Sequence, residues 1–471
     1  MVLPPREALT TAQGAVGVLV HFGVAGLVTV HTLLRKRDVP AAIGWIAMAW
    51  LAPALGALMY FGFGINRVRR RARRLMGPDP LPAYEGRQSL LDDPLGDLEI
   101  AVGAVTRRKS VPGRVLAHLS CGDAAYPEML TTIEQARNHI RLATYIFRTD
   151  DVGRKFILAL AEAKRRGVKV NVLVDGFGGG FLFSPAYRQL RKEGIEAALF
   201  LHSFLPWKMA FLNLRLHKKI LTVDGNIAFV GGLNIGAENV LGSHPKSPVS
   251  DHHFKLAGPI VSEIEREFDE DWQFATGQQL SRSPSVVSLP DSGLARTISS
   301  GPDQETDHLV LVLLSAINAA RRSIRIATPY FLPDEQLITA LRLAALRGVV
   351  VDIVLPADNN HPFVAWAARA HVRPLIESGC QIWFNPPPFD HSKLMTIDGR
   401  WSLIGSANWD ARSLRLNFEL TVELRDRVVA ADIERTIDAR RGRRLTLSEL
   451  DNRHIVIKLR DAAIRLAMPY I

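Results

Sequence analysis

Residues 217–225 read HKKILTVDG, and the chain repeats this pattern once, at residues 391–399, as HSKLMTIDG. In both places five residues follow the aspartate–glycine pair, and a second short motif then begins. That motif is GGLN at residues 231–234 and GSAN at residues 405–408. A single match to six fixed residues has odds of about one in 20 to the sixth power at any start position. Two matches with identical spacing therefore indicate a duplicated unit.

Each copy predicts a strand that carries an imidazole and an ammonium group side by side. Residues two apart on a strand point to the same face, so His217 pairs with Lys219 and His391 pairs with Lys393. The Asp-Gly pair that follows predicts a tight hairpin turn, from which a second strand runs back. Small residues at the end of that strand let the backbone and the asparagine amide approach a ligand closely.

Two such units that face each other would surround one pocket with two histidines, two lysines and two asparagines. These groups supply up to four positive charges and further hydrogen-bond donors, which is the chemistry of a phosphate site. We therefore predict a catalytic set formed by the motif residues His217, Lys219, Asp224, His391, Lys393 and Asp398. We predict phosphate contacts from Asn234, Asn408 and Ser406.

Each of these residue types also has a plainer interpretation. A single histidine on a strand is usually structural, and a single lysine two residues away usually belongs to a solvated face. Duplication at a fixed spacing has no packing explanation, so we favour the functional interpretation for the His–Lys pairs. For Asp224 and Asp398 we favour a turn or salt-bridge role over a chemical one, because Asp-Gly is a common turn dipeptide.

Longer repeats flank the two motifs and predict an α/β fold. Residues 140–148 and 324–331 are β-rich runs, and each is followed by a helical pattern, an Arg-Gly stop and a second β-branched strand. This alternation indicates α/β layers with parallel strands. Runs rich in proline, glycine and serine predict the boundaries. We expect a linker at 76–103, a first lobe at 104–275, a linker at 276–301 and a second lobe at 302–471.

The N-terminal region, residues 1–75, predicts a transmembrane helical hairpin. Ala8–Leu34 and Val39–Asn66 contain no Asp, Glu, Lys or Arg, and each exceeds the roughly 20 residues that cross a bilayer core as a helix. Only four residues separate the two stretches. A signal peptide is the rival for the first stretch, but its apolar part is too long and no clear cleavage site follows. A buried hairpin of a soluble protein is the other alternative.

Charge predicts the orientation of this hairpin. Six arginines follow the second stretch, between Arg67 and Arg74, and one further arginine precedes the first, whereas the loop between the stretches holds three basic residues. The positive-inside rule then places both ends, and the bulk of the chain, in the cytoplasm at the inner membrane. The arginine run supplies six of the formal net charge of +11. Beside a span such a run is more typical of contact with anionic lipid headgroups than of nucleic-acid binding.

Composition and isolated motifs exclude or weaken other assignments. Two cysteines, Cys121 and Cys380, exclude a disulfide framework, a cysteine-rich zinc site and an iron–sulfur cluster. The triplet Asp251-His252-His253 is a weak metal motif, because it has neither cysteine partners nor a second carboxylate cluster. The glycine-rich loop at 175–180 lacks the helix and the ribose-binding acid of a dinucleotide site. Residues 455–466 are amphipathic, and we favour a packed C-terminal helix over one that lies on the membrane.

The twin His-x-Lys-x4-Asp motifs resemble the signature of the phospholipase D superfamily, and within it the chain is similar to the bacterial cardiolipin synthases. The likeness extends over nearly the whole chain. It includes the hairpin with residues 41–45 and 53–64, the runs 145–153 and 328–333, the segments 405–413 and 416–419, and the terminal MPYI. Ser392 and the stretch 242–250 depart from the family pattern without touching the motif residues.

The resemblance implies two pseudo-symmetric lobes, each a mixed sheet flanked by helices, and a mechanism without metal or cofactor. One motif histidine attacks a phosphodiester and becomes a phosphohistidine, while the other protonates the leaving alcohol and deprotonates the incoming one. By analogy His217 is the nucleophile, although the pseudo-symmetry leaves this assignment open. By position, Asp251 and Glu419 match the family's acids that orient the histidines.

The resulting prediction is a membrane-anchored cardiolipin synthase that joins two phosphatidylglycerol molecules and releases glycerol. The hairpin holds the pocket where anionic lipid headgroups lie. Three alternatives stay open: a phospholipase D-type hydrolase, a transferase with another phosphatidyl donor, and a nuclease or nucleic-acid binder, which the hairpin disfavours. Both half-sites lie in one chain, so catalysis does not require an oligomer.

Overall fold

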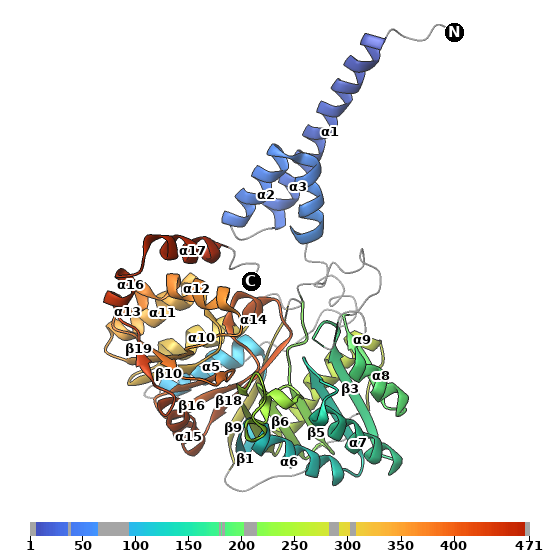
Figure 1. Ribbon diagram of the computed structural model, residues 1–471, viewed down its shortest axis with the longest axis vertical. Coiled ribbons are helices and arrows are strands. Elements are labelled where there is room, and N and C mark those ends of the chain that lie inside the picture. The colour runs from blue at the N-terminus through green and yellow to red at the C-terminus, as the bar shows by residue number, and fades with distance from the viewer. Residues whose placement is uncertain are drawn as a thin grey trace. The chain divides into compact units, whose positions relative to one another are not determined.

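The computed structural model describes residues 6–35, 39–64, 94–178, 180, 184–201, 214–281, 292–301 and 308–466 (Figure 1). The chain separates into two compact units. One unit comprises Met1–Arg74 with Leu205–Phe211, and the other comprises Leu75–Phe204 with Leu212–Ile471. The arginine run predicted as a membrane anchor lies outside the described residues.

The N-terminal unit is helical and contains one candidate membrane span among its described residues. Its elements are α1 (Arg6–Arg35), α2 (Val39–Leu51), α3 (Pro53–Met59) and the π-helical turn η1 (Tyr60–Gly64). Within α1, Val18–Arg35 is long and apolar enough to cross a bilayer, and most of its surface is exposed. This helix indicates membrane anchoring. The second predicted span is not a continuous helix, because α2 ends after 13 residues and α3 begins at Pro53.

The chain reverses direction between α2 and α3, which lie side by side (Figure 1). The rings of Trp45 and Tyr60 are 5.4 Å apart. In one continuous helix, 15 residues would separate two such positions by about 22 Å. Residues 39–64 therefore form a compact helical pair against α1, in which Val28, Ala49 and Tyr60 are buried together.

The second unit is built on one large mixed sheet. Within the described residues fifteen strands pair in the order β19-β13-β12-β10-β15-β16-β18-β9-β1-β8-β6-β5-β2-β3-β4. The strands of the first half are β1 (Val111–Ser120), β2 (His139–Thr144), β3 (Lys169–Asp175), β4 (Glu196–Phe200), β5 (Ile220–Val223), β6 (Ile227–Gly231) and β8 (His252–Ala257). Those of the second half are β9 (Gly293–Ser300), β10 (Ser323–Ala327), β12 (Val350–Pro356), β13 (Gln381–Asn385), β15 (Leu394–Ile397), β16 (Trp401–Gly405), β18 (Glu419–Arg425) and β19 (Arg443–Arg444).

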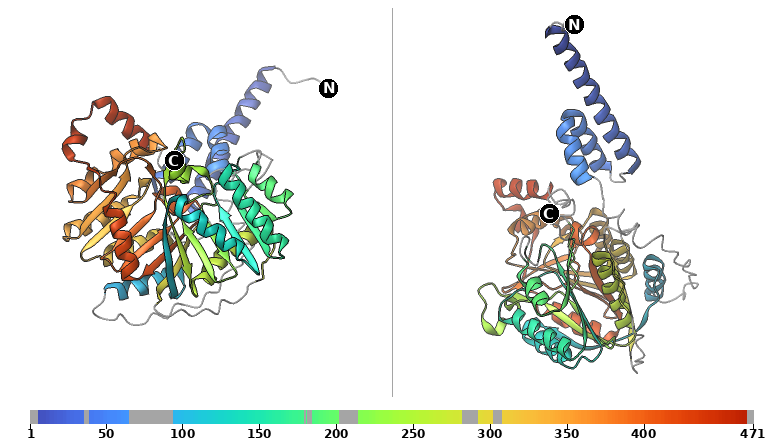
Figure 2. Two further views of the ribbon diagram at one scale, coloured as in Figure 1. Left: turned by 60° about the horizontal axis from the view of Figure 1, so that its bottom comes forward. Right: turned by 90° about the vertical axis from the view of Figure 1, so that its right-hand side faces the viewer.

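The strand order is the same in both halves when it is followed outward from the central β1–β9 pair. The first half runs β1-β8-β6-β5-β2-β3-β4, and the second runs β9-β18-β16-β15-β10-β12-β13. In each half the outer three of these strands are parallel, and the remaining pairs are antiparallel. The predicted α/β architecture with a mixed sheet is confirmed, and the strand order shows its duplication. The strands of the two halves, green in the first and orange to red in the second, lie side by side (Figure 2).

Helices cover both faces of the sheet. In the first half these are α6 (Cys121–Glu134), α7 (Asp151–Arg165), α8 (Pro185–Lys192) and α9 (Ile260–Thr276), with the short turns η3 (Ala237–Asn239) and η4 (Leu241–Ser243). In the second half they are α10 (His308–Ala319), α11 (Glu335–Leu346), α12 (Pro362–His371), α13 (Arg373–Glu377), α14 (Ala411–Arg415), α15 (Arg427–Asp438), α16 (Leu447–Asp451) and α17 (Ile455–Leu466). Each half buries its own apolar core on one side of the sheet.

Local sequence signals set the ends of the repeated helices. The side chains of Asp150 and Asp334 cap the N-termini of α7 and α11 by accepting a hydrogen bond from the backbone three residues on. Both helices end at the Arg-Gly stops. Gly167 and Gly348 there adopt φ values of 91° and 89°, a conformation that only glycine takes easily.

Two stretches predicted as linkers contain regular structure. Helix α5 (Pro94–Thr106) lies largely within 76–103, and its Leu95, Leu98 and Val102 are buried in the core of the second half. Strand β9 lies within 276–301 and pairs with both β1 and β18. Sequence composition marked these stretches as breaks, but their apolar side chains complete the second half.

The C-terminal helix α17 packs against α12. Ile464 packs against the buried cluster of Val364, Ala367 and Ala368, and the guanidinium of Arg460 lies 3.8 Å from the ring centre of Trp366. This contact accords with the packed helix that we favoured for residues 455–466.

Candidate active site

The two repeated motifs lie where the parallel strands of each half end. Ala143 of β2 is paired with Ile220 of β5, and Ala327 of β10 is paired with Leu394 of β15. The motif histidines precede β5 and β15, so they lie just beyond the carboxyl ends of β2 and β10. In α/β sheets this edge is where ligands generally bind.

The motif aspartates hold the turns of the two hairpins. Asp224 and Asp398 have φ values of 55° and 54°, and the glycines after them have 67° and 65°, as a type I′ turn requires. The carboxylate of Asp224 accepts from the amides of residues 137–139, at 2.7–2.9 Å. That of Asp398 accepts from the amides of residues 321–323, at 2.7–2.9 Å. Neither aspartate lines the pocket, so the structure favours the turn role over the catalytic one.

Backbone hydrogen bonds join the motif of each half to the opposite half. The amide of His217 donates to the carbonyl of Phe418 at 2.9 Å, and the amide of His391 donates to the carbonyl of Ser250 at 2.7 Å. A short parallel ladder between β7 (Val249–Ser250) and β14 (Phe389–Asp390) carries the second contact, and a Leu216–Phe418 bridge carries the first. These contacts place the acidic residue of one half beside the histidine of the other.

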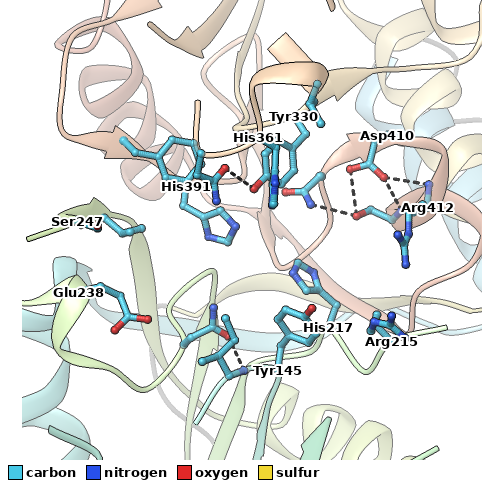
Figure 3. Close-up of a pocket in the computed structure, with 18 of the residues that line it drawn as sticks. Tyr145, Arg215, His217, Glu238, Ser247, Tyr330, His361, His391, Asp410 and Arg412 are labelled. Carbon is cyan, nitrogen blue, oxygen red and sulfur yellow. Dashed lines mark hydrogen bonds between the residues drawn. The ribbon is translucent and has the colours of Figure 1, made fainter. Parts of the chain in front are cut away.

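The two histidines face each other across the pocket (Figure 3). Each is held by an acid from the opposite half. His217 Nδ1 donates to Glu419 Oε2 at 2.9 Å, and His391 Nδ1 donates to Asp251 Oδ2 at 2.8 Å. The imidazole centres are 6.5 Å apart, with ring planes at 84°. With Nδ1 engaged, each ring keeps Nε2 available for chemistry. The structure therefore places Asp251 and Glu419 where the resemblance put them, with the pairing crossed between halves.

Burial and the neighbouring charges favour neutral imidazoles at the two motif histidines and ionised carboxylates at their two acids. Burial, together with the lysine charges, lowers the pKa of His391 to about 3 and also lowers the pKa of His217. Although burial opposes it, the nearby lysines and histidines lower the pKa values of Asp251 and Glu419. At neutral pH both Nε2 atoms therefore carry free lone pairs.

The motif lysines lie buried behind the histidines. Lys219 Nζ donates to the carbonyl of His217 at 2.7 Å, and Lys393 Nζ contacts the carbonyl of His391. Burial lowers the pKa of Lys219 to about 7 and that of Lys393 to about 8. An anionic ligand would raise both values and hold both lysines in the charged form.

The predicted phosphate contacts fall into two groups. Asn234 and Asn408 line the pocket, and the buried Oδ1 of Asn408 has no hydrogen-bond partner among the described residues. Ser406 does not line it; its hydroxyl donates to Glu419 Oε2 at 2.6 Å. This corrects the phosphate-contact prediction for Ser406, which positions Glu419 instead.

The pocket has a volume of about 860 Å³, and residues of both halves line it. Sequence reasoning missed several of its lining residues, which are Tyr145, Tyr330, Arg215, Arg412, Asp410 and Asn417. The two tyrosines occupy matching places in the repeated strand ends, with ring centres 5.2 Å and 6.2 Å from the nearest motif histidine. That repeat was a usable signal. Arg412 lies in the stretch 405–413 that carries the resemblance, where it was given no role, and no motif marked Arg215.

The weaker motifs have structural roles. The imidazole of His252 contacts His118 at 2.7 Å and the guanidinium of Arg440 at 2.6 Å, while Asp251 serves His391. Among the described residues no group of three His, Cys, Asp or Glu side chains has a geometry that could hold a metal ion. Asp175, at the start of the glycine-rich loop, accepts from the amides of Phe177, Gly178 and Leu216, so it fixes the segment that leads into His217.

This geometry agrees with comparisons to known proteins. A family model described as "Cardiolipin synthase, PLD-like domain" matches residues 129–272 and 313–441, more than half of the chain. The chain belongs to the cardiolipin synthase family of phospholipase D-like proteins. The family resemblance seen in the sequence is thereby confirmed.

Individual relatives cover nearly the full length of this family member. Cardiolipin synthase 1 of Bacillus cereus is 30% identical, over 98% of this chain and 95% of the relative. The major cardiolipin synthase of Bacillus subtilis strain 168 is 31% identical, over 93% of this chain and 95% of the relative. The crystal structure of a phosphatidylserine synthase from Haemophilus influenzae has the same fold, with a TM-score of 0.58 and 15% identity over 77% of this chain and 97% of that one. The chain is thus a cardiolipin synthase-type phosphatidyltransferase of phospholipid biosynthesis.

Proposed function

We propose that the substrates are two phosphatidylglycerol molecules and that the products are cardiolipin and glycerol. The observation that carries this proposal is the pair of imidazoles, 6.5 Å apart, that each hold Nδ1 on a buried carboxylate and keep Nε2 free. One ring can attack phosphorus while the other exchanges a proton with an alcohol oxygen. Transfer between two alcohols needs both functions in turn.

In the first step His217 Nε2 attacks the phosphorus of one phosphatidylglycerol. The P–N bond forms as the P–O bond to the glycerol headgroup breaks, and His391 gives its Nε2 proton to the departing oxygen. His391 gains that proton as the anionic phosphodiester binds, because the added negative charge raises its pKa from about 3. The result is a phosphatidyl-histidine and free glycerol.

In the second step His391 Nε2 takes the proton of a primary hydroxyl on the second phosphatidylglycerol. The hydroxyl oxygen attacks phosphorus, the P–N bond breaks and its electron pair returns to His217. Cardiolipin leaves, its negative charge leaves with it, and His391 gives the proton it holds back to solvent, which restores the starting state. We assign Lys219, Lys393, Asn234 and Asn408 to the phosphoryl oxygens, where cations and amide donors oppose the charge that builds up in each transition state.

The acids Asp251 and Glu419 support this cycle from behind the rings. A carboxylate on Nδ1 fixes the tautomer that leaves Nε2 reactive, and it stabilises the imidazolium formed when Nε2 gains a bond or proton. The two acids lie at 2.8–2.9 Å from their histidines. Both acids therefore position the histidines in the first step and in the second.

We further propose that the catalytic unit lies on the cytoplasmic face of the inner membrane. Helix α1 supports anchoring, and the basic residues after residue 66 support a cytoplasmic location. The sequence predicts two spans joined by a short loop, with both ends on the cytoplasmic side.

The test is an assay of the purified protein in lipid–detergent micelles with phosphatidylglycerol labelled in both its acyl and glycerol parts. Labelled cardiolipin with an equal amount of free glycerol is expected. Phosphatidic acid as the sole lipid product would replace the proposal with hydrolysis. Activity should persist in EDTA, and a strict requirement for an added metal ion would contradict the mechanism. Cardiolipin made only when another phosphatidyl donor is supplied would overturn the choice of substrate.

A further inference from the structure

Two arginines to which sequence reasoning gave no role lie together at one end of the pocket. Arg215 comes from the first half and Arg412 from the second, and both line the cavity beside Tyr145 (Figure 3). Arg215 precedes His217 by two residues on an extended segment, so both side chains can face the same cavity. The guanidinium of Arg215 stacks 4.1 Å from the ring centre of Phe177.

A backbone contact between the halves and a turn within the second half bring the segments of the two arginines together. The carbonyl of Arg412 accepts from the amide of Asn417 at 2.8 Å, and the carbonyl of Arg215 accepts from the amide of Phe418 at 2.8 Å. Burial and the positive charge of Arg215 lower the pKa of Arg412. Two like charges held side by side on a cavity wall are stabilised when an anion binds between them.

A polar group beside the arginines also lacks a partner. Asn417 is 7% exposed, lines the same cavity, and its Oδ1 accepts no hydrogen bond among the described residues. Its amide nitrogen is already engaged with Glu419 Oε1 at 3.2 Å. A buried acceptor left open in this way suits a hydroxyl donor on a ligand.

We propose that Arg215 and Arg412 bind the phosphodiester of the second phosphatidylglycerol, the acceptor, while Asn417 Oδ1 accepts from a hydroxyl of its glycerol. This inference rests on the proposed function. The acceptor carries a phosphate of its own, and the three carbons of glycerol separate that phosphate from the attacking oxygen. A second anion site close to, but distinct from, the histidine pair is therefore what the reaction requires. Arg215 meets this requirement two residues from His217.

The proposal predicts a change in acceptor choice rather than loss of chemistry. Arg215→Gln, Arg412→Gln and the double variant would be assayed with labelled phosphatidylglycerol as donor and two competing acceptors. One acceptor is phosphatidylglycerol, which gives cardiolipin, and the other is labelled glycerol, which has no phosphate and regenerates phosphatidylglycerol. Each single variant should lower the ratio of cardiolipin formation to glycerol exchange by at least about tenfold, through KM for the lipid acceptor, with exchange within about threefold of the wild type.

The matched control is Arg415→Gln, which removes the same charge from the same helix α14 but pairs with Asp334 on the outside at 2.7 Å. It should leave the ratio unchanged. Equal loss of cardiolipin formation and glycerol exchange in the pocket variants would overturn the acceptor site, because it would place the arginines on the donor phosphate. An unchanged ratio would overturn it as well. A wild-type protein that makes no cardiolipin from phosphatidylglycerol would instead refute the proposed function.

A second inference rests on the N-terminal unit alone and concerns how often the chain crosses the membrane. Trp50, near the end of α2, donates to Thr29 of α1 at 3.0 Å, whereas Tyr60, ten residues later, contacts His31 at 2.7 Å. The chain thus returns toward the C-terminal end of α1 after Trp50. With 13 residues α2 is about 20 Å long, short of a bilayer core of about 30 Å.

The reversal is closely packed and keeps its backbone bonded. A Cβ on Gly56 would lie 2.6 Å from the carbonyl oxygen of Met48, so only glycine permits this approach. The amide of Ala52 donates to Met48 at 2.9 Å and that of Gly56 donates to Ala52 at 2.6 Å. Non-helical backbone at membrane depth is tolerated where its polar groups find partners inside the protein, as these two amides do.

We infer that α1 crosses the bilayer once and that residues 39–64 enter and leave it on the cytoplasmic side. Charge supports this arrangement independently. The one-span arrangement places nine basic residues on the cytoplasmic side, three in the loop at 35–37 and six between Arg67 and Arg74. Only Arg6 then lies on the other side. The two-span alternative divides the same residues seven to three. The stronger asymmetry accords better with the positive-inside rule.

Cysteine accessibility separates the two arrangements. The native Cys121 and Cys380 are buried, so single cysteines introduced as Leu3→Cys, Asp38→Cys and Gly77→Cys would report their own positions in active full-length protein. A membrane-impermeant maleimide on intact cells should label only Leu3→Cys, and permeabilised cells should label all three. Labelling of only Asp38→Cys in intact cells would establish two spans and overturn the inference. Labelling of Gly77→Cys in intact cells would overturn the cytoplasmic placement.

Discussion

The two halves of the catalytic unit share a strand order, a hairpin and a His-x-Lys pair, but they hold their acids differently. In the first half Asp251 lies against Gly232, where a Cβ would come within 2.2 Å of its carboxylate. In the second half the longer Glu419 lies against Ser406, whose hydroxyl donates to it at 2.6 Å. A shorter acid therefore accompanies the smaller residue, and a longer acid accompanies a hydroxyl partner. Duplication preserved the position of each carboxylate while the side chains that set it changed.

The comparison also shows why neither half is sufficient alone. His217 is held by Glu419, and His391 is held by Asp251, so each half supplies the histidine of one pair and the acid of the other. Backbone bonds from the same histidines to Phe418 and Ser250 enforce this crossing. The site exists only when both halves are assembled, which accords with a duplicated unit in one chain.

The largest expected effect is loss of either histidine. His217→Ala and His391→Ala should each lower phosphatidyl transfer from phosphatidylglycerol by more than about a thousandfold, because one ring forms the covalent bond and the other moves the proton. Radiolabelled cardiolipin formation measures this, and circular dichroism checks folding. Substantial activity in either folded variant would contradict the assignment of separate roles to the two histidines.

The crossed acids should have the next largest effect. Asp251→Asn and Glu419→Gln keep shape and hydrogen bonding but lose the charge that stabilises an imidazolium, so kcat should fall by about 10²- to 10⁴-fold. A donor with a p-nitrophenol leaving group needs no proton from His391. With it, Glu419→Gln should still slow release of p-nitrophenol, whereas Asp251→Asn should have little effect. The reverse pattern would show that the histidine roles are exchanged.

The buried lysines predict an alkaline limb in the pH profile. The pKa values of about 7 for Lys219 and about 8 for Lys393 mean that both lose their charge as pH rises through this range. Binding of an anionic phosphodiester then weakens, so kcat/KM should fall about tenfold per pH unit between pH 7 and 8 and up to about a hundredfold per unit above 8. The substitution Lys393→Arg keeps the charge at that position, so it should remove the steeper part above pH 8 and leave the limb set by Lys219. A flat kcat/KM up to pH 9.5 would contradict the assignment of the lysines to phosphate.

Substituting Gly232 and Ser406 each by the other's residue type should have smaller effects, and it tests whether the two halves hold their acids differently. Ser406→Gly removes one hydrogen bond to a charged acid, worth about 1.5 kcal/mol, so kcat should fall about tenfold. Gly232→Ser instead places a Cβ against the Asp251 carboxylate and should cost more. Steady-state assays of both variants measure the difference. Equal effects would indicate that the two acids are held in equivalent ways.

The turn aspartates should affect stability and leave the chemistry intact. Asp224→Asn and Asp398→Asn each weaken three hydrogen bonds to backbone amides and should lower the free energy of unfolding by about 1–3 kcal/mol. Activity per folded molecule should stay within about twofold of the wild type. Thermal melts and active-site titration provide the two readings. A large drop in kcat with an unchanged melt would return these residues to the catalytic set.

Repetition explains how far the sequence could predict this site. The histidines, lysines and asparagines repeat at fixed spacing, so their meeting in one pocket followed from duplication, and the hairpin turns followed from Asp-Gly. The crossing of Asp251 and Glu419 depends on contacts between residues about 140 and 200 positions apart, which no local pattern encodes. The role of Ser406 and the convergence of Arg215 and Arg412 arise from the same long-range assembly. In the N-terminal unit, apolar length predicted burial in a bilayer, but it did not reveal the reversal at Pro53.

The most direct test of the two-histidine site is trapping of the covalent intermediate with the p-nitrophenol donor. After an alkaline quench, which preserves phosphohistidine, mass spectrometry of peptides would locate the phosphatidyl group. In His391→Ala, which cannot activate the acceptor, the adduct should accumulate on His217 with a stoichiometric burst of p-nitrophenol. In His217→Ala no adduct and no burst should form. An adduct on His391 in the His217→Ala variant would contradict the assignment, and turnover without any histidine adduct would contradict the mechanism itself.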